Sequence, residues 1–125
     1  MPEGVSAETQ VAEASEALAE NDVVNLWDDS GTLKARKADA TDDTKPVHGY
    51  VKEGVTLGNN ATVFTDGFLP GTGLTIGSKY FLSTTPGTVT TTAPSGEDEI
   101  VQPVGVAVSA TRIKFEPMPI YIVRA

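Results

Sequence analysis

From Asp22 onward, apolar and polar residues alternate in short runs, which is the pattern of β-strands that bury one face. Val24 and Leu26 fall on one side of the first run, and their neighbours fall on the other. Residues 28–31, with the sequence DDSG, have the composition of a tight turn, so we expect a hairpin into residues 32–38. Further strands are expected over residues 46–52, 61–64, 79–83, 89–92, 100–109, 111–115 and 120–123, with polar loops at 39–45 and 95–99.

The chain contains this pattern twice. Three pairs of landmarks lie 56 positions apart (82 − 26, 87 − 31, 105 − 49), namely Leu26 and Leu82, Gly31 and Gly87, and Gly49 and Gly105. The stretch QPVGVAVS at residues 102–109 likewise has a counterpart in KPVHGYVK at residues 45–52. We therefore predict a mainly β fold, a compact β-barrel or sandwich built from two duplicated β units. The two copies are expected to share one core in which Leu26 and Leu82 are both buried.

These landmarks also predict where the units begin and end. Residues 22–125 are expected to form a single β domain, preceded by an acidic N-terminal arm or helix over residues 1–21. Within the domain the expected division is copy one at 22–67, a glycine-rich connector at 68–77 and copy two at 78–125.

The N-terminal segment is rich in Ala and Glu and differs in composition from the rest. Val11, Ala14 and Leu18 form a narrow apolar stripe at helical spacing, which predicts a helix from about Ser6. A helix with so little apolar surface is stable only when it packs on something. The alternative is an extended arm that becomes ordered on a partner.

Charge is distributed unevenly along the chain. The first 33 residues carry eight acidic side chains and no Lys or Arg, so they account for the whole net charge of −8. Such a segment suits docking onto a basic protein surface, with Glu13 and Glu16 beside the apolar stripe, although a solvated terminus has the same composition. Nucleic acid is not an expected partner, because the nine basic residues form no cluster larger than KARK at residues 34–37.

The length of 125 residues fits one domain. The chain has no cysteine, which leaves neither a disulfide scaffold nor a thiolate metal site. Its apolar runs are much shorter than the roughly 18 residues that span a bilayer, and its N-terminus lacks a signal-peptide pattern. We therefore expect neither membrane insertion nor secretion by that route.

Catalytic chemistry is not predicted. His48 is the only histidine, and no serine lies in a Gly-x-Ser-x-Gly turn, so a nucleophile would have few possible bases. The aspartates around residues 28, 29, 39, 42 and 43 do not have the spacing of a calcium loop and are expected to be solvated turn residues. We expect no catalytic site, no metal and no cofactor.

Several stretches resemble small virion proteins of tailed bacteriophages. These are VVNLWDDSGTLKARKADATDDTKPVHGYV, YFLSTTPGTVTTTAP and IVQPVGVAVSAT, and the resemblance covers about residues 19–115. They are similar to capsid decoration (cement) proteins and to related β-rich fibre modules. The resemblance implies a compact, commonly trimeric β protein that is made in the host cytoplasm. It then binds the major capsid protein on the capsid exterior and stabilises the shell.

Fibre modules have similar sequences, which leaves a second function open. In that alternative the chain binds a host surface glycan, and Trp27, Tyr50 or Tyr80 would have to be exposed as stacking platforms. For the decoration protein we expect a homotrimer. Its contacts between subunits are expected to use the apolar C-terminal residues Ile120, Ile122 and Val123.

Overall fold

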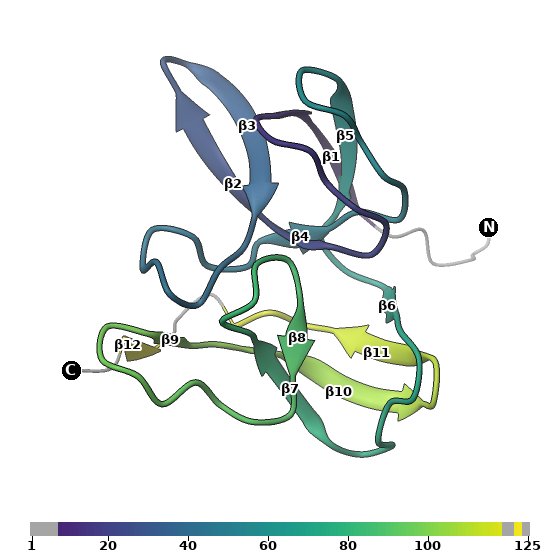
Figure 1. The fold of residues 1–125 in the computed structure, drawn as a ribbon. Coiled ribbons are helices and arrows are strands. Elements are labelled where there is room, and N and C mark those ends of the chain that lie inside the picture. Colours follow the sequence, from purple (N-terminus) through teal and green to yellow (C-terminus); the bar gives the residue numbers. More distant parts are fainter. Residues whose placement is uncertain (1–7, 119–121, 124–125) are drawn as a thin grey trace.

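The computed structural model describes residues 8–118 and 122–123, which form β-strands and no helix (Figure 1). The first unit is a closed barrel of β1 (Thr9–Ala14), β2 (Val23–Asp29), β3 (Thr32–Lys37), β4 (Gly49–Tyr50) and β5 (Asn60–Phe64). The second unit is an open sheet of β6 (Phe68–Pro70), β7 (Lys79–Leu82), β8 (Val89–Thr90), β10 (Pro103–Ser109) and β11 (Arg112–Phe115). A small separate sheet pairs β9 (Ile100–Val101) with β12 (Ile122–Val123).

The order of strands confirms the mainly β fold and its internal duplication. Followed from β1 around the barrel, the order is β1, β5, β4, β2, β3, and across the open sheet it is β6, β11, β10, β7, β8. Each strand therefore has a counterpart in the other unit at the same place in the sheet. We call the barrel copy one and the open sheet copy two.

The strand register carries the same repeat. Gly49 in β4 pairs with Val24 in β2, and Gly105 in β10 pairs with Tyr80 in β7. A shift of 56 residues turns the first pair into the second, since 80 − 24 and 105 − 49 are both 56. The expectation that these glycines occupy equivalent places is confirmed.

Both positions need glycine because the neighbouring strand comes very close. A Cβ atom on Gly49 would lie 2.7 Å from the carbonyl oxygen of Phe64 in β5. A Cβ atom on Gly105 would overlap the carbonyl oxygen of Lys114 in β11, and Gly105 also has a φ of 150°. The missing side chain therefore allows the same strand contact in both copies.

The copies differ in closure. In copy one, β1 and β3 pair in parallel through Glu13 with Lys34 and Ala14 with Ala35, which completes the barrel. No such pairing joins β6 and β8 among the residues that the structure describes. Instead, the turn before β8 binds copy one, since the Gly87 N–H donates to the carbonyl oxygen of Ala38 at 2.8 Å.

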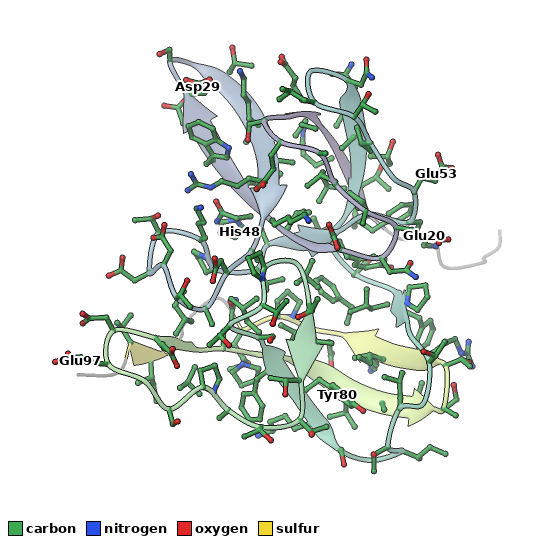
Figure 2. The ribbon with its side chains drawn as sticks, viewed as in Figure 1. Glu20, Asp29, His48, Glu53, Tyr80 and Glu97 are labelled. Atoms are coloured by element: carbon green, nitrogen blue, oxygen red, sulfur yellow. The ribbon has the colours of Figure 1, made fainter. Side chains whose placement is uncertain are left out.

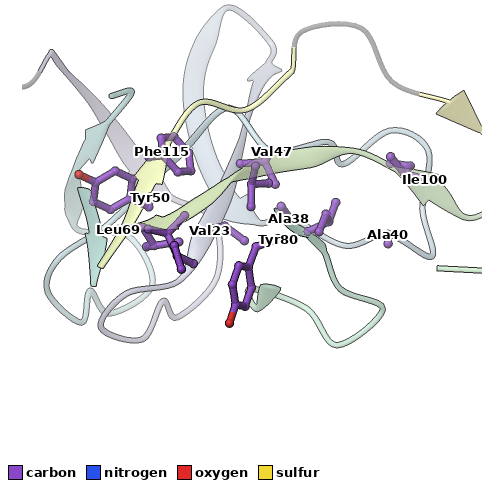
Figure 3. Packing of buried hydrophobic residues seen from close by; sticks show 13 residues of the cluster. Val23, Ala38, Ala40, Val47, Tyr50, Leu69, Tyr80, Ile100 and Phe115 are labelled. Carbon is purple, nitrogen blue, oxygen red and sulfur yellow. The ribbon is translucent and has the colours of Figure 1, made fainter. Parts of the chain in front are cut away.

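The interior is divided into two apolar clusters, so the expectation of one common core is only partly right. One cluster fills the barrel with mostly small side chains of copy one, namely Ala12, Ala14, Leu18, Val24, Ala35, Val51, Ala61 and Val63. The other lies between the two copies and takes residues from both, among them Val23, Val47, Tyr50, Leu82 and Phe115 (Figure 3).

Leu26 and Leu82 are consequently in different clusters. Leu82 is fully buried between the copies, whereas Leu26 is partly buried and packs against the barrel cluster. The alternation predicted for β2 explains this result, because Val24 and Leu26 point into the barrel while Val23 points toward copy two. One strand thus supplies both interiors.

The prediction of a helix in the N-terminal segment is wrong. Residues 9–14 form β1, which pairs antiparallel with β5 along its length and continues the barrel wall. Its inward residues Ala12 and Ala14 are almost completely buried, because the small interior of a five-stranded barrel accepts small side chains. Barrel pairing outweighs a weak helical preference.

The expected connector also contains a strand. Residues 68–70 form β6, which pairs with β11 and is the counterpart of β1 in copy two. The sequence pattern thus places the first strand of each unit in a flanking segment. The polar loops expected at 39–45 and 95–99 contain no strand.

Candidate binding surface

The outer face of copy two brings apolar and basic side chains together. The strand register aligns Phe68 of β6, Lys114 of β11, Val106 of β10 and Lys79 of β7 in one row across four strands. Each of these residues is exposed, while their neighbours Leu69, Tyr80, Ala107 and Ile113 are buried. The alternation of inward and outward residues thus places the row on the surface.

The row extends to Arg112 and Val108. The guanidinium carbon of Arg112 lies 4.8 Å from the ring centroid of Phe68, a cation–π contact that holds the base over the ring. Phe68, Val106 and Val108 are 43%, 40% and 44% exposed, which is high for large apolar side chains on one sheet. We call these six residues (Phe68, Lys79, Val106, Val108, Arg112 and Lys114) the cationic face.

The charge on this face is opposite to that of the rest of the molecule. The five strands of the copy-two sheet contain three basic side chains and no acidic one. A nearby acid is Glu116, whose carboxylate lies 3.9 Å from the Lys114 ammonium. By contrast, residues 8–66 carry twelve acidic and five basic side chains, a net charge of −7. The cationic face is therefore a basic patch on a molecule that is acidic as a whole.

The junction between the copies is fixed by a buried glutamine. Gln102 is 1% exposed, and its side-chain oxygen accepts the Val47 N–H at 2.7 Å. Its amide nitrogen donates to the carbonyl oxygens of Val47, at 3.0 Å, and Met118, at 2.9 Å. Gln102 and Val47 belong to the two related stretches QPVGVAVS and KPVHGYVK, so the repeated segments contact each other across the junction.

His48, the only histidine, has a structural role in this arrangement (Figure 2). Its Nδ1 accepts the Leu26 N–H at 3.0 Å, and the Asn25 amide lies 3.3 Å from the same atom. His48 is exposed as a residue, but partial desolvation of its ring lowers its pKa, which favours the neutral ring that can accept this bond.

The aromatic residues proposed for glycan stacking are mostly inaccessible. Tyr50 is fully buried and Tyr80 is 7% exposed, as their apolar neighbours suggest. Trp27 is partly buried, and the Arg36 guanidinium carbon lies 4.7 Å from its ring centroid. Its indole N–H donates to Ser15 Oγ at 3.1 Å, so the ring is already held within the protein.

The N-terminal docking residues do not form one stripe. Ala14 and Leu18 are buried in the barrel, whereas Val11 is 55% exposed. Glu13 lies 3.8 Å from the Lys34 ammonium. The Glu16 carboxylate accepts the Lys37 N–H at 2.9 Å, a contact within copy one. The strand period places these side chains on different sides of the chain, which a helical period would not.

The C-terminal residues proposed for subunit contacts are only partly described. Ile122 and Val123 pair with β9 and are 67% and 40% exposed. Ile120 lies outside the described residues.

The aspartates of the 39–45 loop organise local turns. Asp39 Oδ1 accepts the N–H and the hydroxyl of Thr41, and Asp42 Oδ1 does the same for Thr44. These contacts lower the pKa of Asp42, with the Thr44 hydroxyl as the main cause. Among residues 8–118 and 122–123, no group of three or more His, Asp or Glu side chains is arranged to hold a metal ion.

Sequence reasoning missed the cationic face, although part of the signal was present. The segment RIKF alternates basic and apolar residues, and Val106 and Val108 occupy alternate positions of β10. Only the pairing of β6, β11, β10 and β7 shows that these positions are adjacent.

Comparisons with protein-family models, curated protein sequences and solved structures gave no match. In the described part of the chain, no helix is long and apolar enough to cross a membrane.

Proposed function

We propose that this chain is a non-enzymatic structural protein of a tailed-bacteriophage virion. It decorates the capsid exterior as a homotrimer, binds the surface of the major capsid protein and stabilises the shell. The sequence resemblance over residues 19–115 motivates this assignment.

The observation that carries the proposal is the cationic face. Three exposed large apolar side chains lie on one sheet with three basic residues and no acid, which is the composition of a surface that contacts protein. Phosphate-binding surfaces need more clustered basic residues than this. A protein that presents such a contact surface fits a component of an assembly such as a virion.

The rigid junction between the copies supports the same function. A protein that strengthens a shell must transmit force between its contacts without deforming. The shared cluster of buried side chains and the three bonds of Gln102 join copy one and copy two through close-packed contacts. These contacts support the proposed mechanical role.

The test is co-sedimentation with empty capsids of the encoding phage that lack this protein, in parallel with host cells. We expect saturable binding to capsids, none to cells, and a higher disruption temperature for the decorated capsids. Binding to cells without binding to capsids would instead favour the fibre module that recognises a host glycan.

A further inference from the structure

We propose that the cationic face binds a second copy of this chain, through the tip of that copy's β2–β3 hairpin. The tip comprises residues 28–33, and the contact joins copy two of one molecule to copy one of the next. This inference rests on the homotrimer of the proposed function and deepens it, because it names a contact between subunits that forms in the absence of a shell.

The tip combines acidic side chains with an exposed leucine. Asp28 pairs directly with Leu33 across the hairpin, so their side chains lie on the same side, and Leu33 is 39% exposed. Asp29 follows at the end of β2, where it lies 2.9 Å from the Lys34 ammonium. Leu33 and the Asp28 carboxylate are thus presented together on one side of the hairpin end, while Asp29 and Lys34 lie on the other side.

The tip is also well ordered by its own bonds. Ser30 and Gly31 have φ values of 54° and 93°, which are those of a tight two-residue hairpin turn. The Asp28 carboxylate accepts the Gly31 N–H at 2.8 Å and fixes the turn further. The tip therefore loses little conformational entropy when it binds.

Tip and face are complementary in both chemistry and charge. The leucine of the tip matches Phe68, Val106 and Val108, while the Asp28 carboxylate beside it matches the basic side chains of Lys79, Arg112 and Lys114. In such an interface the apolar centre supplies most of the affinity, and the charged rim fixes the orientation. The twelve acids and five bases of residues 8–66 make copy one the acidic partner in this contact.

One molecule cannot make this contact with itself. The hairpin projects from the barrel at one end of the molecule, and the copy-two sheet lies at the other (Figure 1). Asp29 at the tip and Tyr80 in β7 are accordingly far apart (Figure 2). The contact is therefore head-to-tail, and the rigid junction fixes the rotation from one molecule to the next. A head-to-tail contact of fixed rotation closes into a ring or continues as a filament.

The test uses purified full-length protein and three variants. Val106→Glu places an acid on the cationic face, and Leu33→Lys places a base on the tip. Leu57→Glu is the matched control, because Leu57 is 68% exposed and lies outside both surfaces. Exposed positions tolerate such changes, and the thermal transition of each variant verifies its fold.

Sedimentation velocity at concentrations up to about 100 µM would detect contacts of micromolar strength. We expect oligomers for the wild type and for Leu57→Glu, and monomers for Val106→Glu and for Leu33→Lys. Mixing the two monomeric variants should yield a dimer, because the first retains an intact tip and the second an intact face. A contact made by the same surface on both partners would not be rescued by mixing.

A wild type that stays monomeric over this range, or a Val106→Glu protein that assembles normally, would overturn the inference. So would a mixture without dimers. Co-sedimentation with capsids is a separate measurement, so failure of this contact and failure of the proposed capsid binding remain distinguishable.

Discussion

Replacing Gln102 with leucine tests how strongly the junction holds the two copies together. Gln102 and Gln10 are the only glutamines in the chain, and they lie in opposite environments. Gln102 is 1% exposed and bonds to both backbone groups of Val47. Gln10 is exposed and donates only to the adjacent Val11 carbonyl.

Leucine has nearly the volume of glutamine, so the main cost comes from the polar groups that lose their partners. In Gln102→Leu the N–H and C=O of Val47 are left buried without a hydrogen bond. Each such group costs about 1–3 kcal/mol, which gives about 2–6 kcal/mol in total. The Met118 carbonyl is only partly buried and can bind water instead, so it adds little. The loss is a large fraction of the roughly 5–15 kcal/mol that stabilises a typical domain.

The assay is thermal unfolding followed by circular dichroism at neutral pH, with Gln10→Leu as the control. For a chain of this size 1 kcal/mol corresponds to about 4 °C, so Gln102→Leu should lower Tm by roughly 8–24 °C. Gln10→Leu should change Tm by less than about 2 °C, as expected for a surface substitution. If the two variants have the same Tm, the bonds of Gln102 do not stabilise the junction and the reasoning is refuted.

Four further predictions address other parts of the molecule. Leu82→Ala should lower the free energy of unfolding in urea by about 2–5 kcal/mol, because it opens a cavity between the copies. The surface control Leu57→Ala should leave it nearly unchanged. Gly105→Ala should lower Tm strongly. A residue with a side chain loses about 1–3 kcal/mol at a φ of 150°, and the added Cβ also meets β11. An unchanged Tm would contradict the close approach of the two strands. Deleting residues 1–14 removes β1 and should abolish the cooperative unfolding transition, whereas a separate arm could be removed without this effect. The lowered pKa of His48 means that the unfolded state binds the proton more readily than the folded state. The free energy of unfolding should therefore fall as the pH drops below about 6.5. A His48→Gln variant should show a smaller fall in Tm between pH 7.5 and 5.5 than the wild type.

Local rules determined much of the fold from the sequence alone. The 56-residue repeat predicted two related units, and the register of Gly49 and Gly105 confirms it. Alternation within β2 predicted that Val24 and Leu26 share one side of the strand, and both pack in the barrel cluster. The composition DDSG predicted the hairpin turn that Ser30 and Gly31 form. In each case the relevant physics acts over a few residues, through the strand period of two and the conformational freedom of glycine.

Long-range pairing decided the rest. The composition of residues 9–14 favours a helix, and only pairing in the gap between β3 and β5 makes them strand β1. Residues 68–70 likewise become β6 only when β11 is beside them. Strands of this kind gain their stability from partners far away in sequence, so local composition does not specify them.

The candidate surface was set by tertiary structure for the same reason. Phe68, Lys79, Val106 and Lys114 are scattered over residues 68–114, and each by itself is an ordinary exposed residue. The pairing of four strands places them in one row and collects three bases on one face of a chain whose net charge is −8. Sequence by itself determined the strand pattern, the repeat and the excess of acid. Which side chains share a face was decided only by the tertiary structure, because adjacency across a sheet depends on register between segments distant in the chain.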